Sequence, residues 1–173
     1  GKRFPEILEE KLLKPLSMSN TTFQPNLELL KRHPRYAKRI ANLDDEKISA
    51  FLEKKKRESK RFVNVAGGLI STPNDLVKFY RLHSLRGKIG AKRLIPEKVI
   101  AKLYEKQPGK RGYGLGFSLF GNAVVGHGGA SGTIGAVDLE NDRVVVILTQ
   151  AGSTAARPLT RRGMQLAREI LAK

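Results

Sequence analysis

The chain has 173 residues, 40% of them hydrophobic, which allows one domain with a real core but hardly two. No apolar run approaches the ~18 residues of a membrane-spanning helix, so we predict no membrane span. The formal net charge of +17 favours anionic partners, but Lys and Arg are spread along the chain. We therefore predict no specific nucleic-acid site. Cysteine is absent, which excludes disulfides and thiolate metal sites.

The first two thirds of the chain carry helical patterns. A helix over residues 4–16 is predicted behind Pro5, ended by Pro15 and the polar residues that follow. Thr72, Pro73 and Asp75 predict the start of a mostly buried helix that Gly87 closes. Further helices are predicted over residues 26–32, 45–58 and 96–107, the first inside an otherwise irregular segment from 21 to 44.

The segment from Gly112 to Gln150 reads differently, because apolar and β-branched residues alternate there with small ones. Gly121-Asn122 and the run from Glu140 to Asp142 are hairpin signals. A last helix is predicted from Ser153 or Thr154 to about residue 172.

This order of elements predicts an α+β fold. A helical region over residues 1–111 precedes residues 112–173, which are predicted to form an antiparallel meander of three to four strands and a C-terminal helix. The C-terminal helix packs on that sheet. We predict that both parts form one structural domain.

The residues that could carry chemistry are few. His33, His83 and His127 lack the spacing of metal ligands, so we predict no metal and no cofactor. The glycine-rich run at 126–132 lacks the Gly-Lys-Ser/Thr of a phosphate loop, and Ser131 fails the nucleophile-elbow pattern at Thr133.

His127 nevertheless stands beside three glycines at a strand end. Backbone N–H groups just beyond it could hold a ligand carbonyl or carboxylate, and one of them could serve an oxyanion hole. The alternative is that the glycines only relieve crowding under a helix. Spacing alone does not decide between the two.

The sequence resembles the C-terminal half of the serine β-lactamase-like family, which includes class C β-lactamases, penicillin-binding proteins and related esterases. The fold expected is therefore a partial β-lactamase/transpeptidase-like fold. The matching segments are residues 13–21 (Leu-Lys-Pro-Leu-Ser-Met-Ser-Asn-Thr), 66–76 (Ala-Gly-Gly-Leu-Ile-Ser-Thr-Pro-Asn-Asp-Leu), 112–117 (Gly-Tyr-Gly-Leu-Gly-Phe), 126–132 (Gly-His-Gly-Gly-Ala-Ser-Gly) and 144–150 (Val-Val-Val-Ile-Leu-Thr-Gln).

The resemblance implies roles for the residues around His127. Its run with Gly128 and Gly129 matches the third catalytic motif, Lys-Thr-Gly or His-x-Gly. His127 is then expected near the catalytic group, Gly129 leaves room for substrate, and the N–H of Ala130 is an oxyanion donor. Other residues are expected to bind the substrate, an amide or ester of a small molecule or peptide: Gly128, Ser131 and Tyr113.

The other two motifs of the family do not occur in the 173 residues. No serine has a lysine three positions later, so Ser-x-x-Lys is missing, and neither Tyr-x-Asn nor Ser-x-Asn is present. We therefore expect an N-terminally truncated segment of a serine hydrolase that is inactive alone. The alternatives are a non-catalytic module that binds a peptide or cell-wall fragment and, with less support, a basic nucleic-acid-associated protein.

Truncation has expected physical consequences. The sheet would have an unpaired edge and an uncovered apolar face, so the chain would be marginally stable or pair with its missing half or a second copy. For the parent protein we expect a periplasmic or secreted location, with the cytoplasm also possible.

Overall fold

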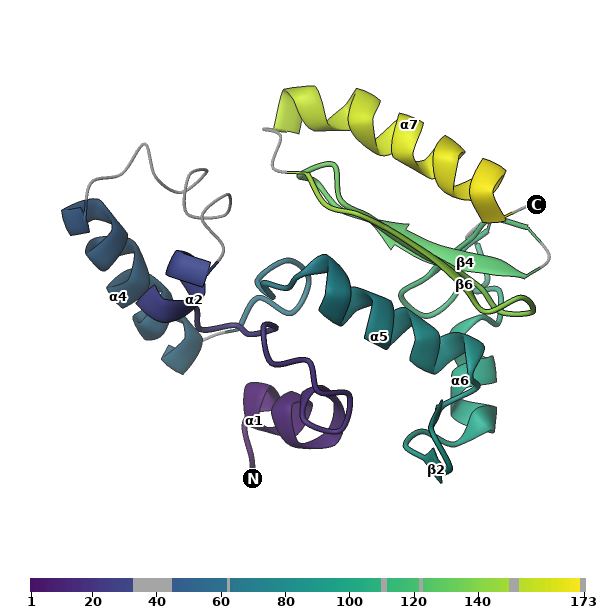
Figure 1. The fold of residues 1–173 in the computed structure, drawn as a ribbon, viewed down its shortest axis with the longest axis horizontal. Helices are drawn as coiled ribbons and strands as arrows, with labels where there is room; N and C mark the ends of the chain where they lie inside the picture. Colours follow the sequence, from purple (N-terminus) through teal and green to yellow (C-terminus); the bar gives the residue numbers. More distant parts are fainter. Residues whose placement is uncertain (33–44, 62, 110–111, 122, 150–152, 172–173) are drawn as a thin grey trace. The chain divides into compact units, whose positions relative to one another are not determined.

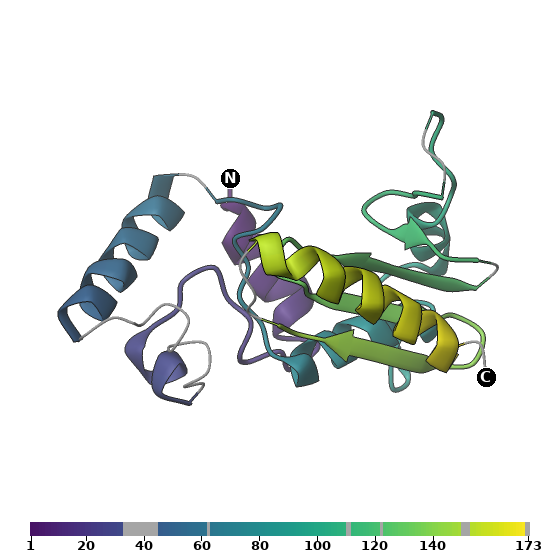
Figure 2. The same ribbon diagram turned by 90° about the horizontal axis from the view of Figure 1, so that it is seen from above.

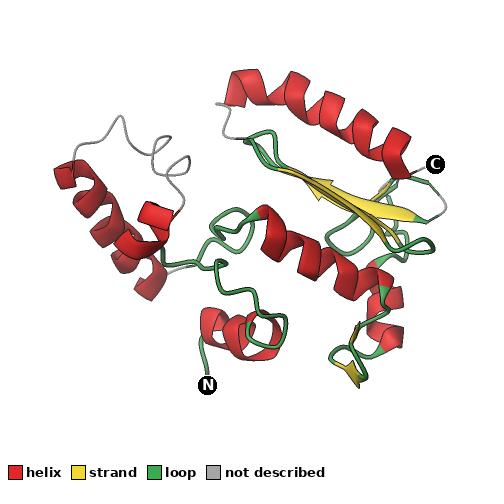
Figure 3. Cartoon of the chain, viewed as in Figure 1, coloured by secondary structure: helices red, strands yellow, loops and turns green. Residues whose placement is uncertain are grey.

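The computed structural model describes all residues except 33–44, 62, 110–111, 122, 150–152 and 172–173. The chain forms two compact units, Gly1–Thr72 and Pro73–Lys173. This division does not fall at residues 111 and 112, and the prediction of a single domain with that internal boundary stays a prediction. Figure 3 shows helices in both units, whereas the main sheet belongs to the second. Each unit is described by itself below.

The first unit opens with α1 (Phe4–Leu8), whose start is fixed by a reciprocal pair between Arg3 and Glu6. The helix then widens into the π-helical segment η1 (Glu9–Leu13), where the N–H of Lys14 reaches the carbonyl of Glu9 at 2.9 Å. The prediction of a single helix over residues 4–16 is therefore wrong in two respects: the second half is π-helical, and the helical structure ends at Leu13. Pro15 has no N–H to continue the ladder, so the helix cannot extend past Lys14 in regular form.

Two segments of the first unit that are far apart in sequence lie side by side. Thr22 and Ile70 exchange backbone hydrogen bonds of 2.9 Å, and the hydroxyls of Thr21 and Ser71 are 2.7 Å apart. The rest of the unit contains α2 (Leu27–Arg32) and α4 (Asp45–Arg61), both predicted, with α4 three residues longer than expected. Its buried apolar side chains are Leu13, Leu16, Met18, Phe23, Leu29 and Leu30.

The second unit begins with α5 (Pro73–Ser84), as the helix-start pattern predicted. It closes at Gly87, where φ is +85° and a β-carbon would stand 2.1 Å from the carbonyl oxygen of Ile95, so only glycine fits. A small hairpin of β1 (Lys88–Ile89) and β2 (Lys92–Arg93) follows, which the sequence reasoning missed.

Helix α6 (Glu97–Leu103) ends four residues before the predicted end at 107. The carbonyl of Leu103 accepts the N–H of Leu115 at 2.8 Å, and the N–H of Gln107 donates to Tyr113 at 3.0 Å. The chain after α6 therefore pairs with the loop at 112–116 instead of continuing the helix. This loop was predicted as strand.

The sheet is antiparallel in the order β3 (Ser118–Leu119), β4 (Val124–Gly128), β5 (Ile134–Asp138), β6 (Arg143–Ile147), which confirms the predicted meander. The predicted turn between β5 and β6 is confirmed as well. The Asp138 carboxylate accepts the N–H groups of Glu140 and Asn141 at 2.9 and 3.0 Å. The other predicted turn, at Gly121-Asn122, includes Asn122, which is outside the described residues.

Helices cover both faces of this sheet, as Figures 1 and 2 show. The C-terminal helix α7 (Ser153–Leu171) lies along one face, where Ala167 and Leu171 pack against Ala136. On the other face Tyr80 of α5 packs with Val125, Val137 and Phe117. The α+β class is confirmed, but the expected uncovered apolar face is wrong, because α5 fills it.

Candidate active-site wall

His127 is the fourth residue of β4 and its side chain is exposed. It pairs across the strands with Gly135 of β5, so both positions project to the same face of the sheet. That face is the one covered by α5, because a β-carbon on Gly135 would meet the ring of Tyr80. Burial raises the pKa of Tyr80 to about 12, and a backbone hydrogen bond with His127 offsets part of this rise. Tyr80 thus supports the main chain of His127 from beneath.

The imidazole of His127 contacts Tyr113. The hydroxyl of Tyr113 lies 2.7 Å from Nε2 of His127, and the two rings meet edge to face at 77° with centroids 5.7 Å apart. The other ring nitrogen, Nδ1, lies 2.6 Å from the carbonyl oxygen of Gly128. Both nitrogens of the ring are therefore engaged, one by a loop residue and one by its own strand.

Tyr113 is held in place by its backbone. It forms a bridge with Ser118 at the start of β3, and its carbonyl accepts the N–H of Gln107. The next residue, Gly114, packs so closely on α6 that a β-carbon there would be 2.2 Å from the carbonyl oxygen of Leu103. The Gly-Tyr-Gly sequence is thus what allows the loop to bring the tyrosine ring to β4.

The tight turn after β4 contains three of the predicted site residues: Gly129, Ala130 and Ser131. The N–H of Gly129 donates to Thr133 at 2.8 Å, the N–H of Gly132 donates to Gly129 at 3.0 Å, and Thr149 holds the carbonyl of Ser131 at 2.5 Å. Among the described residues, no backbone hydrogen bond uses the N–H of Ala130, which is exposed.

Gly129 has a structural reason to be glycine. A β-carbon on it would stand 2.2 Å from the hydroxyl oxygen of Thr133. The expectation that Gly129 leaves room for a substrate stays a prediction, because the close Thr133 hydroxyl is a second reason for a small residue here.

The edge of β4 beside this turn is open toward β3. Among the described residues, β3 pairs with Val125 and Gly126, and its first residue, Ser118, stands opposite Gly126, so β3 does not reach Gly128. The site is therefore one wall: a strand end with an exposed imidazole, a tyrosine hydroxyl and a backbone donor. Such a wall can orient a carbonyl or amide group.

Comparison with known proteins assigns the chain to a family. The family model described as Beta-lactamase matches residues 1–169. The chain belongs to the Beta-lactamase family. No curated protein sequence matches it.

A crystallised protein from Bacteroides dorei DSM 17855, described as a candidate beta-lactamase, shares the fold. Its TM-score is 0.56, with 16% sequence identity over 98% of this chain and 53% of the other. The Beta-lactamase-family chain described here thus spans about half the length of that protein. At this identity the likeness shows the fold alone.

A second histidine of this Beta-lactamase-family chain is not part of the wall. His83 of α5 is buried among Phe79, Tyr104 and Phe117, with Nδ1 2.5 Å from the Tyr104 hydroxyl. Burial lowers the pKa of His83 to about 4 and raises the pKa of Tyr104. No atom of the described residues bonds its Nε2. His83 is a neutral core residue.

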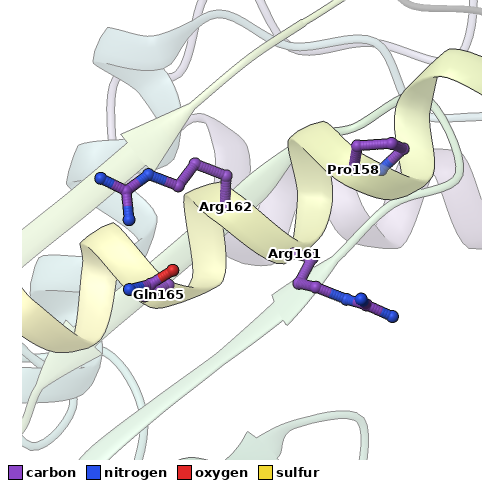
Figure 4. A pocket seen from close by; sticks show the side chains of 4 residues that line it. All are labelled: Pro158, Arg161, Arg162 and Gln165. Atoms are coloured by element: carbon purple, nitrogen blue, oxygen red, sulfur yellow. The ribbon is translucent and has the colours of Figure 1, made fainter.

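A surface hollow on α7 is also separate from the wall, since α7 covers the opposite face of the sheet. Figure 4 shows its lining, with Arg161 and Arg162 extending in different directions from the helix. Arg162 and Gln165 both engage Glu169, at 3.8 and 2.7 Å. This hollow offers no convergent set of groups for catalysis.

Among the described residues, no helix combines the length and apolarity needed to cross a bilayer. Within the same ranges, no three His, Cys, Asp or Glu side chains gather as a metal would require.

The structure brings Tyr113, His127 and Gly128 into direct contact and places Ala130 in the adjoining turn. Sequence reasoning missed Tyr80, which it had placed only in a buried helix, and Thr133. Helical spacing marks Tyr80 as buried but cannot say which strand lies over it. The catalytic and substrate-binding roles of the predicted residues stay predictions.

Proposed function

We propose that the chain is the C-terminal segment of a serine hydrolase that acts on amide or ester bonds by acyl transfer. Its contribution is the wall formed by Tyr113, His127, Gly128 and the turn at 129–131. The observation that supports this most is the exposed imidazole of His127 at the end of β4, in the strand that leads directly into the turn with the exposed Ala130. An ester or amide oxygen could accept the Ala130 N–H as charge develops on it.

The nucleophile of such a reaction is not among the 173 residues in the family's form, because no serine has lysine three positions later. We therefore propose that the chain alone forms no acyl-enzyme. Incubation with a fluorescent penicillin and a serine-reactive phosphonate should leave it unlabelled. Stoichiometric labelling of a serine by either reagent would contradict this.

The same absence favours a second candidate, a module that binds peptides or cell-wall fragments without cleaving them. The coding sequence upstream separates the two. Ser-x-x-Lys and Tyr-x-Asn motifs encoded there in frame support the hydrolase, and an upstream region without them supports the binding module.

Binding by the wall can be measured on the chain itself. We expect benzylpenicillin or an acyl-D-alanyl-D-alanine peptide to shift the amide NMR signals of Gly128, Ala130 and Ser131. His127→Ala should weaken the effect, whereas Lys92→Ala, on the exposed β1–β2 hairpin, should not. Shifts confined to other segments, or none, count against the wall as the substrate site.

A further inference from the structure

The two hydrogen bonds of the His127 ring fix where its proton lies. The carbonyl oxygen of Gly128, 2.6 Å from Nδ1, can only accept, so Nδ1 carries the hydrogen. In the neutral ring Nε2 then holds a lone pair. The hydroxyl of Tyr113, 2.7 Å away, must therefore donate to Nε2.

This direction determines what Tyr113 can offer to a ligand. A phenol has one hydrogen to donate, and here it is directed at Nε2 of His127. The lone pairs on the Tyr113 oxygen remain, so toward any further group the hydroxyl acts as an acceptor. An amide N–H can meet that acceptor, whereas an ester oxygen in the same place has nothing to donate.

The geometry is held from several sides. The loop carrying Tyr113 is fixed by its bridge to Ser118 and by the N–H of Gln107, and the Tyr113 ring packs edge to face on the imidazole. The main chain of His127 is supported by Tyr80 from α5. One tyrosine thus holds the backbone of His127, and another holds its side chain.

We propose that Tyr113 is a positioning residue that also sets specificity: its hydroxyl holds His127 as the Nδ1–H tautomer, and its oxygen accepts the N–H of an amide ligand. The second part rests on the proposed function, since it assumes that acyl compounds bind at this wall. It narrows the ligand class from amides or esters to amides, such as a peptide or an acylamino side chain. The first part stands on the two hydrogen bonds alone.

The tautomer can be read directly in the unmodified chain. Long-range proton–nitrogen NMR correlation of the histidine rings at alkaline pH, where imidazole is neutral, should show hydrogen on Nδ1 of His127. Hydrogen on Nε2 would overturn the proposal. This measurement needs neither a ligand nor a variant.

A pair of variants tests whether Tyr113 is the cause. Tyr113→Phe should move the Nε2 resonance of His127 and increase the share of the Nε2–H tautomer, because the donor to Nε2 is gone. Tyr104→Phe removes the same hydroxyl from the other histidine–tyrosine pair, so it should alter His83 and leave His127 unchanged. An unchanged His127 ring in Tyr113→Phe, with the amide signals of β4 and β5 intact, would overturn the proposal.

Specificity is tested with an N-acyl dipeptide and its depsipeptide analogue, which replaces the reacting amide N–H by an ester oxygen. One net hydrogen bond corresponds to a preference of several-fold, so the chain should bind the amide that much more tightly. Tyr113→Phe should lose the preference. Equal affinities of the unmodified chain for the two compounds would overturn the proposed preference for amides. If the chain binds neither compound, both this preference and the proposed function are overturned. The proposed tautomer of His127 is tested separately and does not depend on either result.

Discussion

The ring of Tyr80 lies over Gly135 so closely that a β-carbon on Gly135 would stand 2.1 Å from Cε2 and 2.4 Å from the hydroxyl oxygen. Gly135 is also the cross-strand partner of His127. The absence of a side chain at 135 is therefore what lets a buried tyrosine lie beneath the exposed histidine. The position of His127 depends on a glycine eight residues further along the chain.

Replacing Gly135 by alanine should therefore destabilise the second unit. Tyr80 is 6% exposed and packed with Phe117, Val125 and Val137, so its ring has little freedom to withdraw. Overpacking of this kind costs about 1–3 kcal/mol, which denaturant unfolding would resolve. Gly67→Ala is the matched control, since its β-carbon meets nothing closer than 3.9 Å. Equal stability of the Gly135→Ala variant and the unmodified chain would show that Tyr80 does not fix this face.

The buried His83 should make stability depend on pH. Burial lowers the pKa of His83 from 6.5 to about 4, so the folded chain binds fewer protons than the unfolded chain between these values. The stability is fully present above pH 6.5 and falls as the pH drops toward 4. At ~1.4 kcal/mol per unit the total loss is roughly 3 kcal/mol.

Urea unfolding at a series of pH values would measure this slope. His83→Gln should be nearly flat over the same window, although less stable near neutrality. The carboxylates Asp138 and Asp142 affect stability in a lower pH range than His83. Their pKa values are lowered from 3.8, so the stability that they contribute is lost only as the pH falls below that value. A slope that persists in His83→Gln would exclude His83 as its source.

The elements of the sheet and its hairpin at 140–142 followed from local chemistry. Asp138 accepts two N–H groups of its own turn, and alternation along β4 and β5 separates the two faces. Patterns of this kind are readable because the interacting residues are neighbours in sequence. The loop at 112–117 was misread as strand because two of its backbone hydrogen bonds join it to Leu103 and Gln107, and the N–H of Gly114 bonds within the loop to Phe117.

The candidate site shows the same limit. His127 stood out by its glycine neighbours, and the family resemblance pointed to Tyr113 and Ala130 without saying what each would contact. The pairing of Tyr113 with Nε2 depends on a bridge to Ser118 and on the close approach of Gly114 to α6. These are contacts between elements, and no periodicity records them. The sheet face that was expected to be uncovered is covered by α5. The sequence pattern did not show this, because α5 (Pro73–Ser84) is far from β4 (Val124–Gly128) along the chain.

Asp142 links the β5–β6 turn to α5 and also adopts a strained backbone. Its carboxylate binds Arg81 at 2.8 Å and the hydroxyl of Ser84, and its φ is +50°. Asparagine, like aspartate, tolerates a positive φ, so Asp142→Asn removes only a half-exposed ion pair. It should lower the free energy of unfolding by less than ~1 kcal/mol. Asp142→Ala should cost about 1 kcal/mol more, because alanine disfavours positive φ. Thermal unfolding would rank them, and equal losses would mean that the backbone is not strained.

The outer edge of β6 leads to the last prediction, because no strand of the described residues pairs with it. Along an antiparallel strand, successive N–H groups point alternately toward one neighbouring strand and away from it. The bonds from Gly129 to Thr133 and from Leu139 to Ala123 show which residues of β4 and β5 bond to each other, and so which residues of β5 bond to β6. The N–H groups of Val145 and Ile147 then face β5, whereas those of Val144 and Val146 face outward. In a monomer, Val144 and Val146 should therefore exchange their amide hydrogens much faster than Val145.

A partner strand would change this pattern. If a second copy pairs along β6, rising concentration should protect Val144 and Val146 and shift the chain to a dimer in size-exclusion chromatography. Exchange at Val145, already bonded to Ala136, should change little and serves as the internal control. Fast exchange at all three valines would contradict the assigned register. Slow exchange at all three in a dilute monomer would show that the edge is already covered.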